Sequence, residues 1–396
     1  MPTGLPSPGR LQARAGERRT VVQVGSYTDW LRTRDDDQLA GLLARRPYLA
    51  APVPGSFASL AGRATSRSAT QRALTEVDAL GLQVLRAALV LGRGTRTQVT
   101  EAVLGPDPDD DTARVAAAVD DLVATGLMWD DETALRPAPG VGALLDPGQH
   151  RAGRTPDGRL FRTVARPPRP VPTVVPAETV AAESGRAAQA LVATVERLVA
   201  AWADPPPVLR RGGLGMRDLR RTAQALGTSQ PEAAFVVELA ASASLVVADL
   251  TGPTGVFTPT TTADTWAAGT LPDRWAGLAR AWLTSARTAW LVGTKDDRAA
   301  VRTACHPDGW RPWLPRLRRA VLTVLAEVGH DRTAGALTAE QVHAALAWRT
   351  PLAVPPLDVV APLLTEAARL GVTGAGALSR AGRALATGGD PATALA

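Results

Sequence analysis

Arginines that recur in two dense clusters are the residues of this sequence best suited to chemistry. The candidate contact residues are Arg210, Arg211, Arg217, Arg220 and Arg221 in one cluster, and Arg311, Arg316, Arg318, Arg319 and Trp313 in the other. A guanidinium binds a phosphate through two parallel hydrogen bonds, and a tryptophan ring stacks on a nucleobase. These two clusters, called here the 210–221 cluster and the 311–319 cluster, therefore predict contact with nucleic acid.

The competing interpretation is that both clusters are solvated helix faces and that the tryptophans belong to the core. Arginine is abundant throughout the chain, Lys295 is the only lysine, and isoleucine and asparagine are absent. That usage is typical of a GC-rich bacterial genome, so arginine richness is partly codon bias. A third group, Arg63, Arg67 and Arg72, is better explained as a solvated face.

Nucleotide hydrolysis is the first catalytic activity to test against the sequence, because winged helices often accompany helicase motors. A P-loop places a lysine and a serine or threonine directly after a glycine-rich loop. Lys295 lies in Gly293-Thr-Lys-Asp-Asp297, which has neither feature. Gly212-Gly-Leu-Gly215 lacks the third glycine of a dinucleotide fingerprint and reads as a turn. We therefore expect no ATP hydrolysis.

Metal binding and nucleophilic catalysis find equally little support. Cys305 is the only cysteine, and its neighbour His306 is too close in sequence for a zinc finger or a Cys–His nucleophile pair. Runs of aspartate, such as Asp109-Asp-Asp111, suit helix starts and solvated loops. The sequence therefore predicts a non-enzymatic protein with no catalytic residues, no metal and no cofactor.

Composition places the chain among globular proteins and favours an acidic partner. Of its 396 residues, 45% are hydrophobic and 21% are charged, and the formal net charge is +6. A single cysteine excludes an internal disulfide and suits a reducing cytoplasm, which is the localisation we expect. The sequence shows neither the apolar core of a signal peptide nor a run long enough to span a bilayer, so no membrane partner is expected.

Three stretches of the chain share one plan: an apolar helix, a short second helix, a third amphipathic helix, and a turn into an extended segment. This order is typical of a winged helix, and repetition of such a unit is the strongest guide to the fold. We expect a mainly α protein with three tandem winged-helix-like units that carry short β wings, preceded by an N-terminal helical segment. The expected organisation is a flexible tail (1–24), the N-terminal segment with the first unit (25–140), a Pro/Gly/Arg-rich linker (141–185), the second unit with a Trp-rich helix (186–310), and the third unit (311–396).

The last helix of each expected unit is poorly suited to reading a DNA sequence. A recognition helix in the major groove presents Arg, Lys, Asn or Gln to the bases. Here Asp109–Ala124 has one Arg against five Asp, Pro231–Ala243 has two Glu and no Arg, and Leu357–Leu370 has Asp358, Glu366 and only Arg369. Phosphates repel acidic helices, so we expect any DNA contact to use the second helices or the wings.

Several segments resemble bacterial helicase-associated proteins of the XPB-type helicase-like family, and the resemblance covers most of residues 26–386. The matching segments are Ser26-Tyr-Thr-Asp-Trp-Leu31, 39–47, 63–85, 207–219, Trp275-Ala-Gly-Leu-Ala-Arg-Ala-Trp-Leu283, Trp348-Arg-Thr-Pro351, Glu366-Ala-Ala-Arg-Leu-Gly-Val372 and Leu378-Ser-Arg-Ala-Gly-Arg383. Members usually continue into a helicase-associated C-terminal domain, which this chain, ending at Ala396, does not contain. The resemblance implies a short or truncated member, and none of its motifs carries a catalytic residue.

Two functions from different classes follow from these observations. The first is a DNA-binding or helicase-associated protein, with DNA and a helicase or other repair or transcription protein as candidate partners. The alternative is a protein-interaction scaffold of winged-helix units that makes no direct contact with DNA. Salt-sensitive DNA binding that is lost on substitution of Arg217, Arg220 and Arg221 distinguishes the first from the second.

Overall fold

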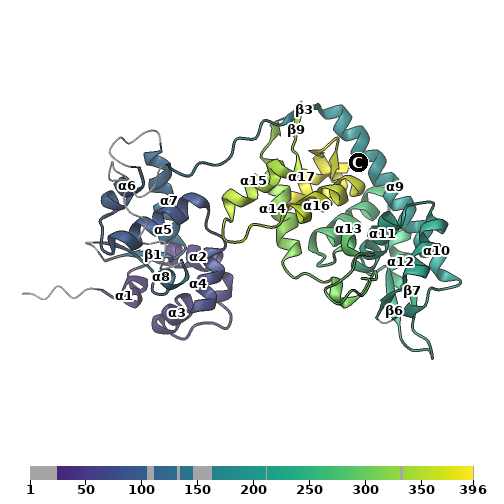
Figure 1. Ribbon diagram of the computed structural model, residues 1–396, viewed down its shortest axis with the longest axis horizontal. Coiled ribbons are helices and arrows are strands. Elements are labelled where there is room, and N and C mark those ends of the chain that lie inside the picture. The colour runs from purple at the N-terminus through teal and green to yellow at the C-terminus, as the bar shows by residue number, and fades with distance from the viewer. Residues whose placement is uncertain are drawn as a thin grey trace, which may run out of the picture. The chain divides into compact units, whose positions relative to one another are not determined.

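The computed structural model describes residues 25–104, 111–131, 134–145, 163–210, 212–330 and 333–395. The described chain is mainly helical with small antiparallel sheets (Figure 1), as the sequence predicts. Its described residues form two compact bodies: body 1 takes those within 1–74 and 80–164, and body 2 takes those within 75–79 and 165–396. The expected tail at 1–24 lies outside the described residues.

Body 1 contains a run of helices and one hairpin. Its elements are α1 (Tyr27–Arg32), α2 (Asp36–Arg45), the 3-10 helix η1 (Pro47–Leu49), α3 (Phe57–Ala64), α4 (Arg67–Leu74), α5 (Ala79–Leu91), α6 (Arg96–Leu104), α7 (Thr112–Ala124), β1 (Met128–Asp130), β2 (Leu135–Pro137) and α8 (Val141–Leu144). Ser26 and Asp35 start α1 and α2 with capping boxes, which satisfy backbone N–H groups that have no partner inside the helix. Leu85 of α5 and Leu122 of α7 are both buried.

The N-terminal helices of body 1 pack on the end of α7 and on the β1–β2 hairpin. The Tyr27 hydroxyl donates to the Gly126 carbonyl at 2.9 Å, and Trp30 Nε1 donates to Asp130 Oδ1 at 2.9 Å. Arg46, only 2% exposed, donates to the carbonyl oxygens of Thr125 and Ala64. Buried cations and aromatic N–H groups need such partners, so the N-terminal segment and the first expected unit fold as one body.

Body 2 holds the remaining elements. They are β3 (Thr173–Pro176), α9 (Ala177–Ala203), β4 (Leu209–Arg210), β5 (Gly213–Leu214), α10 (Met216–Leu226), α11 (Gln230–Ser242), β6 (Val246–Asp249), β7 (Val256–Pro259), α12 (Thr261–Ala267), α13 (Leu271–Thr284), the 3-10 helices η3 (Ala289–Leu291) and η4 (Pro307–Gly309), α14 (Leu314–Ala326), β8 (Gly329–His330), β9 (Thr333–Ala336), α15 (Ala339–Arg349), α16 (Leu357–Leu370), β10 (Thr373–Gly374), β11 (Ala377–Leu378), α17 (Arg380–Thr387) and α18 (Pro391–Leu395).

The stretch expected to be a linker, 141–185, is partly regular structure. Its end supplies β3 and the first turns of α9, and α8 lies at its start. Strand β3 pairs antiparallel with β9, which brings Thr173 opposite Ala336 and Pro176 opposite Thr333. The proline and arginine content of the stretch concealed this short β-branched run, which gains its backbone hydrogen bonds from a partner more than 150 residues away.

One hydrophobic core runs through the second and third expected units. It joins buried residues of α9, α10, α11, α13, α14 and α16. Trp275 of α13 is fully buried, and its Nε1 donates to the Leu370 carbonyl at the end of α16 at 2.7 Å. Gly371 then has a φ of +77°, and a Cβ there would lie 2.4 Å from the Ser184 carbonyl oxygen of α9. The two expected units therefore share their interior.

None of the described helices combines the length and the apolar character that a bilayer-spanning segment requires.

Candidate nucleic-acid interface

The amphipathic helix α10 carries most of the 210–221 cluster. One side of the helix packs into the core through Leu219, Ala223 and Leu226, and Thr222 accepts a hydrogen bond from Trp202 Nε1 at 3.1 Å. The β4–β5 hairpin leads into the helix, and Gly227, at a φ of +65°, ends it. This packing leaves the opposite side of α10 in solvent.

Three arginines occupy that solvent side of α10. Arg217, Arg220 and Arg221 are exposed and lie three and four residues apart, which places them on one helical face. Arg221 pairs with Asp218, whose side chain is largely buried. Within the described part of the chain, Arg217 and Arg220 have no ion-pair partner. The face therefore keeps a net positive charge, which an anionic ligand can neutralise.

The remaining residues of the 210–221 cluster lie on the hairpin before α10. Arg210 ends β4 and is exposed. Arg211 lies outside the described residues. A basic hairpin end that adjoins a basic helix face extends the positive surface along the chain.

The 311–319 cluster divides between surface and core. Arg319 and Trp313 are exposed, and Arg316 is exposed but pairs with Glu76 of body 2 at 2.7 Å. Arg311 donates to the carbonyl oxygens of Asp308 and Trp310, both at 2.9 Å, so its guanidinium stabilises the turn before α14.

Arg318 of the same cluster is 2% exposed and belongs to a buried polar network. Its Nη2 lies 3.0 Å from Glu366 Oε2, and its Nη1 donates to the Trp282 carbonyl at 2.8 Å. Trp282 Nε1 donates to the same Glu366 oxygen at 2.8 Å. Arg318 has no exposed surface to offer a ligand, which removes it from the candidate interface.

A second ion pair, between a buried glutamate and a partly buried arginine, lies beside the first. Arg287 Nη1 is 3.1 Å from Glu238 Oε2, and the backbone N–H of Cys305 donates to Glu238 Oε1 at 2.7 Å. Burial raises the pKa of the Glu238 carboxyl and of the Glu366 carboxyl, and the arginines oppose that shift. Sequence reasoning missed these glutamates as core residues, although Glu238 stands inside the apolar run Phe235-Val-Val-Glu-Leu239.

The last helix of the second expected unit lies in the interior, and that of the third is buried along one side. Every residue of α11 from Ala233 to Ala240 is buried, whereas α16 buries Val360, Leu363 and Glu366 and exposes its opposite side. A buried helix cannot enter a DNA groove, which removes α11 as a DNA contact. The exposed side of α16 carries Asp358 and no exposed arginine, so it does not favour contact with phosphates.

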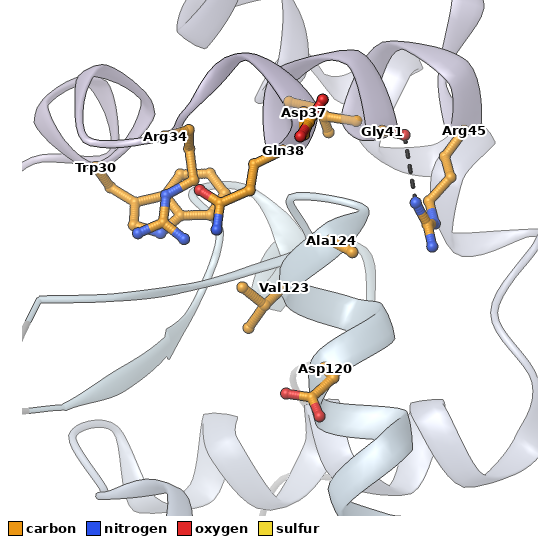
Figure 2. A pocket seen from close by; sticks show the side chains of 10 residues that line it. Trp30, Arg34, Asp37, Gln38, Gly41, Arg45, Asp120, Val123 and Ala124 are labelled. Carbon is orange, nitrogen blue, oxygen red and sulfur yellow. Dashed lines mark hydrogen bonds between the residues drawn. The ribbon is translucent and has the colours of Figure 1, made fainter.

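The last helix of the first expected unit, α7, borders a pocket in body 1. Figure 2 shows Arg34, Gln38 and Arg45 on one side and Asp120 of α7 on the other. The pocket has a volume of about 360 Å³ and a mainly apolar lining. Its charged rim is largely paired: Arg34 lies 3.9 Å from Asp130, and Asp120 pairs with Arg96. This balance of charges gives the pocket no preference for an anion.

The described residues also locate the cysteine and the possible metal ligands. Burial, with the nearby Glu238 carboxylate, raises the pKa of the Cys305 thiol far above neutrality, so the side chain stays a thiol. His306 Nδ1 accepts from the Asp308 backbone N–H at 3.1 Å and caps η4. In the described part of the chain, no group of three or more His, Cys, Asp or Glu side chains could hold a metal ion.

No protein-family model, no curated protein and no solved structure matches this chain.

Proposed function

We propose that this chain is a non-enzymatic nucleic-acid-binding protein that contacts the phosphates of DNA through the exposed face of α10. The observation that supports it is the placement of Arg217, Arg220 and Arg221 on one solvent-facing side of a helix whose other side is anchored in the core. A rigid helix that presents guanidinium groups to solvent binds phosphates without ordering a loop first.

The proposal includes three winged-helix-like units and a helicase partner. The helix and hairpin order α5–α6–α7–β1–β2 supports the first unit, and α9–α10–α11–β6–β7 supports the second. For the third, the order is α14–α15–α16–β10–β11. In the second unit the arginines lie on the second helix. That position favours contact with DNA phosphates over reading of the base sequence. The resemblance to helicase-associated proteins supports a role in DNA repair or transcription.

The test is fluorescence-anisotropy binding to labelled duplex, forked and single-stranded DNA over a salt series. The decisive comparison is between the wild type and the Arg217→Ala, Arg220→Ala double variant. Each phosphate contact contributes about −0.9 to the slope of log K against log salt on duplex DNA, so the double variant is expected to flatten the slope by roughly two. Both arginines are exposed, so the fold should be unaffected.

A matched control removes the same charge elsewhere in body 2. Arg186 of α9 and Arg380 of α17 are both exposed and, like Arg217 and Arg220, have no ion-pair partner among the described residues. The Arg186→Ala, Arg380→Ala variant should keep the wild-type slope if the interface is local to α10. Equal losses in the two double variants would reduce the effect to net charge, and absence of binding at low salt would leave the scaffold alternative.

A further inference from the structure

A pocket lies in body 2 where α14 meets the end of α15 and the loop that follows it. Its volume is about 380 Å³, and its lining is mainly apolar. Pockets that hold small molecules are usually clefts of about 300–1,000 Å³ with apolar walls and a few polar groups. None of its lining residues belongs to α10, so the pocket is separate from the proposed phosphate-contacting face.

Side chains at helical spacing form two of the walls. Trp313, at the N-cap of α14, is followed by Leu317 and Ala320 four and three residues further on, which places the three on one side of the helix. Leu346, only 2% exposed, and Thr350 line the pocket from the end of α15. Because the side chain of Ala320 ends at its Cβ, the pocket keeps the volume that a longer side chain would fill.

The loop after α15 completes the pocket and is held in shape. Ala353, Pro355 and Pro356 line it. The Ala353 N–H donates to the Thr350 carbonyl at 2.8 Å, and the Thr350 hydroxyl donates to the Leu346 carbonyl at 3.1 Å. Each proline also fixes its own φ. A wall that is already ordered loses little entropy when a ligand packs against it.

The charge at the pocket is balanced. Among the described residues that line it, Arg316 is the only charged one, and its Nη2 lies 2.7 Å from Glu76 Oε1. A charged ligand would lose its hydration on entering an apolar pocket, and no free counter-ion is present to offset that cost. The pocket therefore disfavours anions and cations alike.

Trp313 gives the pocket its most specific contact. Its ring is 46% exposed, whereas Trp202, Trp275 and Trp282 of the same body are buried. An exposed indole at the edge of an apolar pocket offers a face on which a flat ring can stack. We propose that this pocket binds a small uncharged aromatic molecule, which stacks on Trp313 and packs against Leu317.

The experiment titrates the protein with three related compounds and follows binding by saturation-transfer NMR of the ligand. The probes are indole, which is neutral, indole-3-carboxylate, which is an anion, and tryptamine, which is a cation. Indole should bind roughly tenfold more tightly than either charged compound. Trp313→Ala should weaken indole binding by roughly tenfold, and Trp313→Phe, which keeps an aromatic face, should retain most of it. Ala320→Leu should abolish binding because it fills the pocket.

Two matched controls test whether the effects are local. Trp310→Ala removes a tryptophan that is 54% exposed but does not line the pocket, and Ala344→Leu adds the same bulk to an exposed position of α15. Both should bind indole as the wild type does. Thermal unfolding checks that Ala320→Leu is folded, and if it is not, the two tryptophan variants and the three probes still decide.

Several results would overturn the proposal. Tighter binding of indole-3-carboxylate than of indole would show that Arg316 is free to bind an anion. Equal losses from Trp310→Ala and Trp313→Ala would mean that indole adheres to any exposed ring. Absence of indole binding at millimolar concentration would exclude the site directly. None of these measurements involves DNA, so they leave the proposed role of α10 unaffected.

Discussion

Helices α10 and α14 each contain a pair of adjacent arginines, but only one of the two helices exposes both to solvent. The pairs are Arg220-Arg221 in α10 and Arg318-Arg319 in α14. Both arginines of α10 are exposed, whereas Arg318 is buried and only Arg319 reaches solvent. The number of arginines in a helix therefore says less about a ligand than their position around the helix axis.

Helical phase accounts for the difference. In α14, Arg318 lies four residues after Leu314 and four before Leu322, so it falls on the buried apolar stripe. Its long side chain must then find a buried anion, which Glu366 supplies. In α10 the buried stripe runs through Leu219, Ala223 and Leu226, and Arg220 and Arg221 fall beside it.

Removing the buried arginine is expected to have the largest effect on stability. Arg318→Ala leaves the Glu366 carboxylate buried without its cation, which costs about 3–5 kcal/mol in comparable buried pairs. Chemical denaturation of the variant measures the loss in the free energy of unfolding. Arg319→Ala, one position along the same helix, should change it by less than about 0.5 kcal/mol.

A double substitution separates the lost ion pair from lost packing. Arg318→Met with Glu366→Leu replaces both charges by apolar groups of similar size, and it should recover part of the stability because no uncompensated charge stays buried. The recovery is incomplete, because Trp282 Nε1 and the Trp282 carbonyl lose their partners. If Arg318→Ala and Arg319→Ala are equally mild, α14 does not bury its arginine and the contrast with α10 fails.

The buried side of α10 is expected to have the next largest effect. Leu219 is 1% exposed, and Leu219→Ala should lower the free energy of unfolding by about 2–5 kcal/mol because it removes buried methyl groups and leaves a cavity. Arg220→Ala on the opposite side should be nearly neutral in the same thermal or denaturant measurement. A large loss from Arg220→Ala would show that the basic face is part of the fold rather than a surface free for a ligand.

Periodicity and caps predicted much of the local structure. The helical character of the chain and the buried positions of Leu85 and Leu122 follow from the spacing of apolar residues. For the N-cap of the first helix the sequence offers both Ser26 and Thr28, and in the structure the cap is Ser26. Burial of Arg318 was also within reach, since its spacing from Leu314 and Leu322 is visible in the sequence, but residue type alone suggested a surface.

Pairings between distant segments could not be read in the same way. The β3–β9 pair and the contact of Trp275 with Leu370 join residues about 100 or more positions apart, and neither partner marks the other by its type. The same holds for Glu238, whose partner Arg287 lies 49 residues further along the chain, in the segment between α13 and η3. For the candidate interface, the sequence identified the arginines but not which of them face solvent.

The smallest expected effect is the pH dependence of stability that comes from Glu238, a buried residue of α11. Burial raises the pKa of Glu238 above its usual value of 4.5, with Arg287 opposing the shift and the nearby Glu366 adding to it. A carboxyl with a raised folded-state pKa binds its proton more tightly in the folded protein. Its contribution to stability is therefore fully present below the unfolded pKa and is lost as the pH rises through the folded-state pKa.

Glu238→Gln removes this titration and can still accept the hydrogen bond from the Cys305 backbone N–H. The wild type should lose stability relative to this variant as the pH rises above about 4.5, when both are followed by denaturant unfolding across a pH series. For Glu232→Gln on the same helix, the pH dependence of the stability difference from the wild type should have the opposite sign. The Ser229 backbone N–H and hydroxyl hold the pKa of Glu232 below its usual range, so its contribution is lost as the pH falls. Parallel pH profiles for the two variants would show that burial does not control the titration of Glu238.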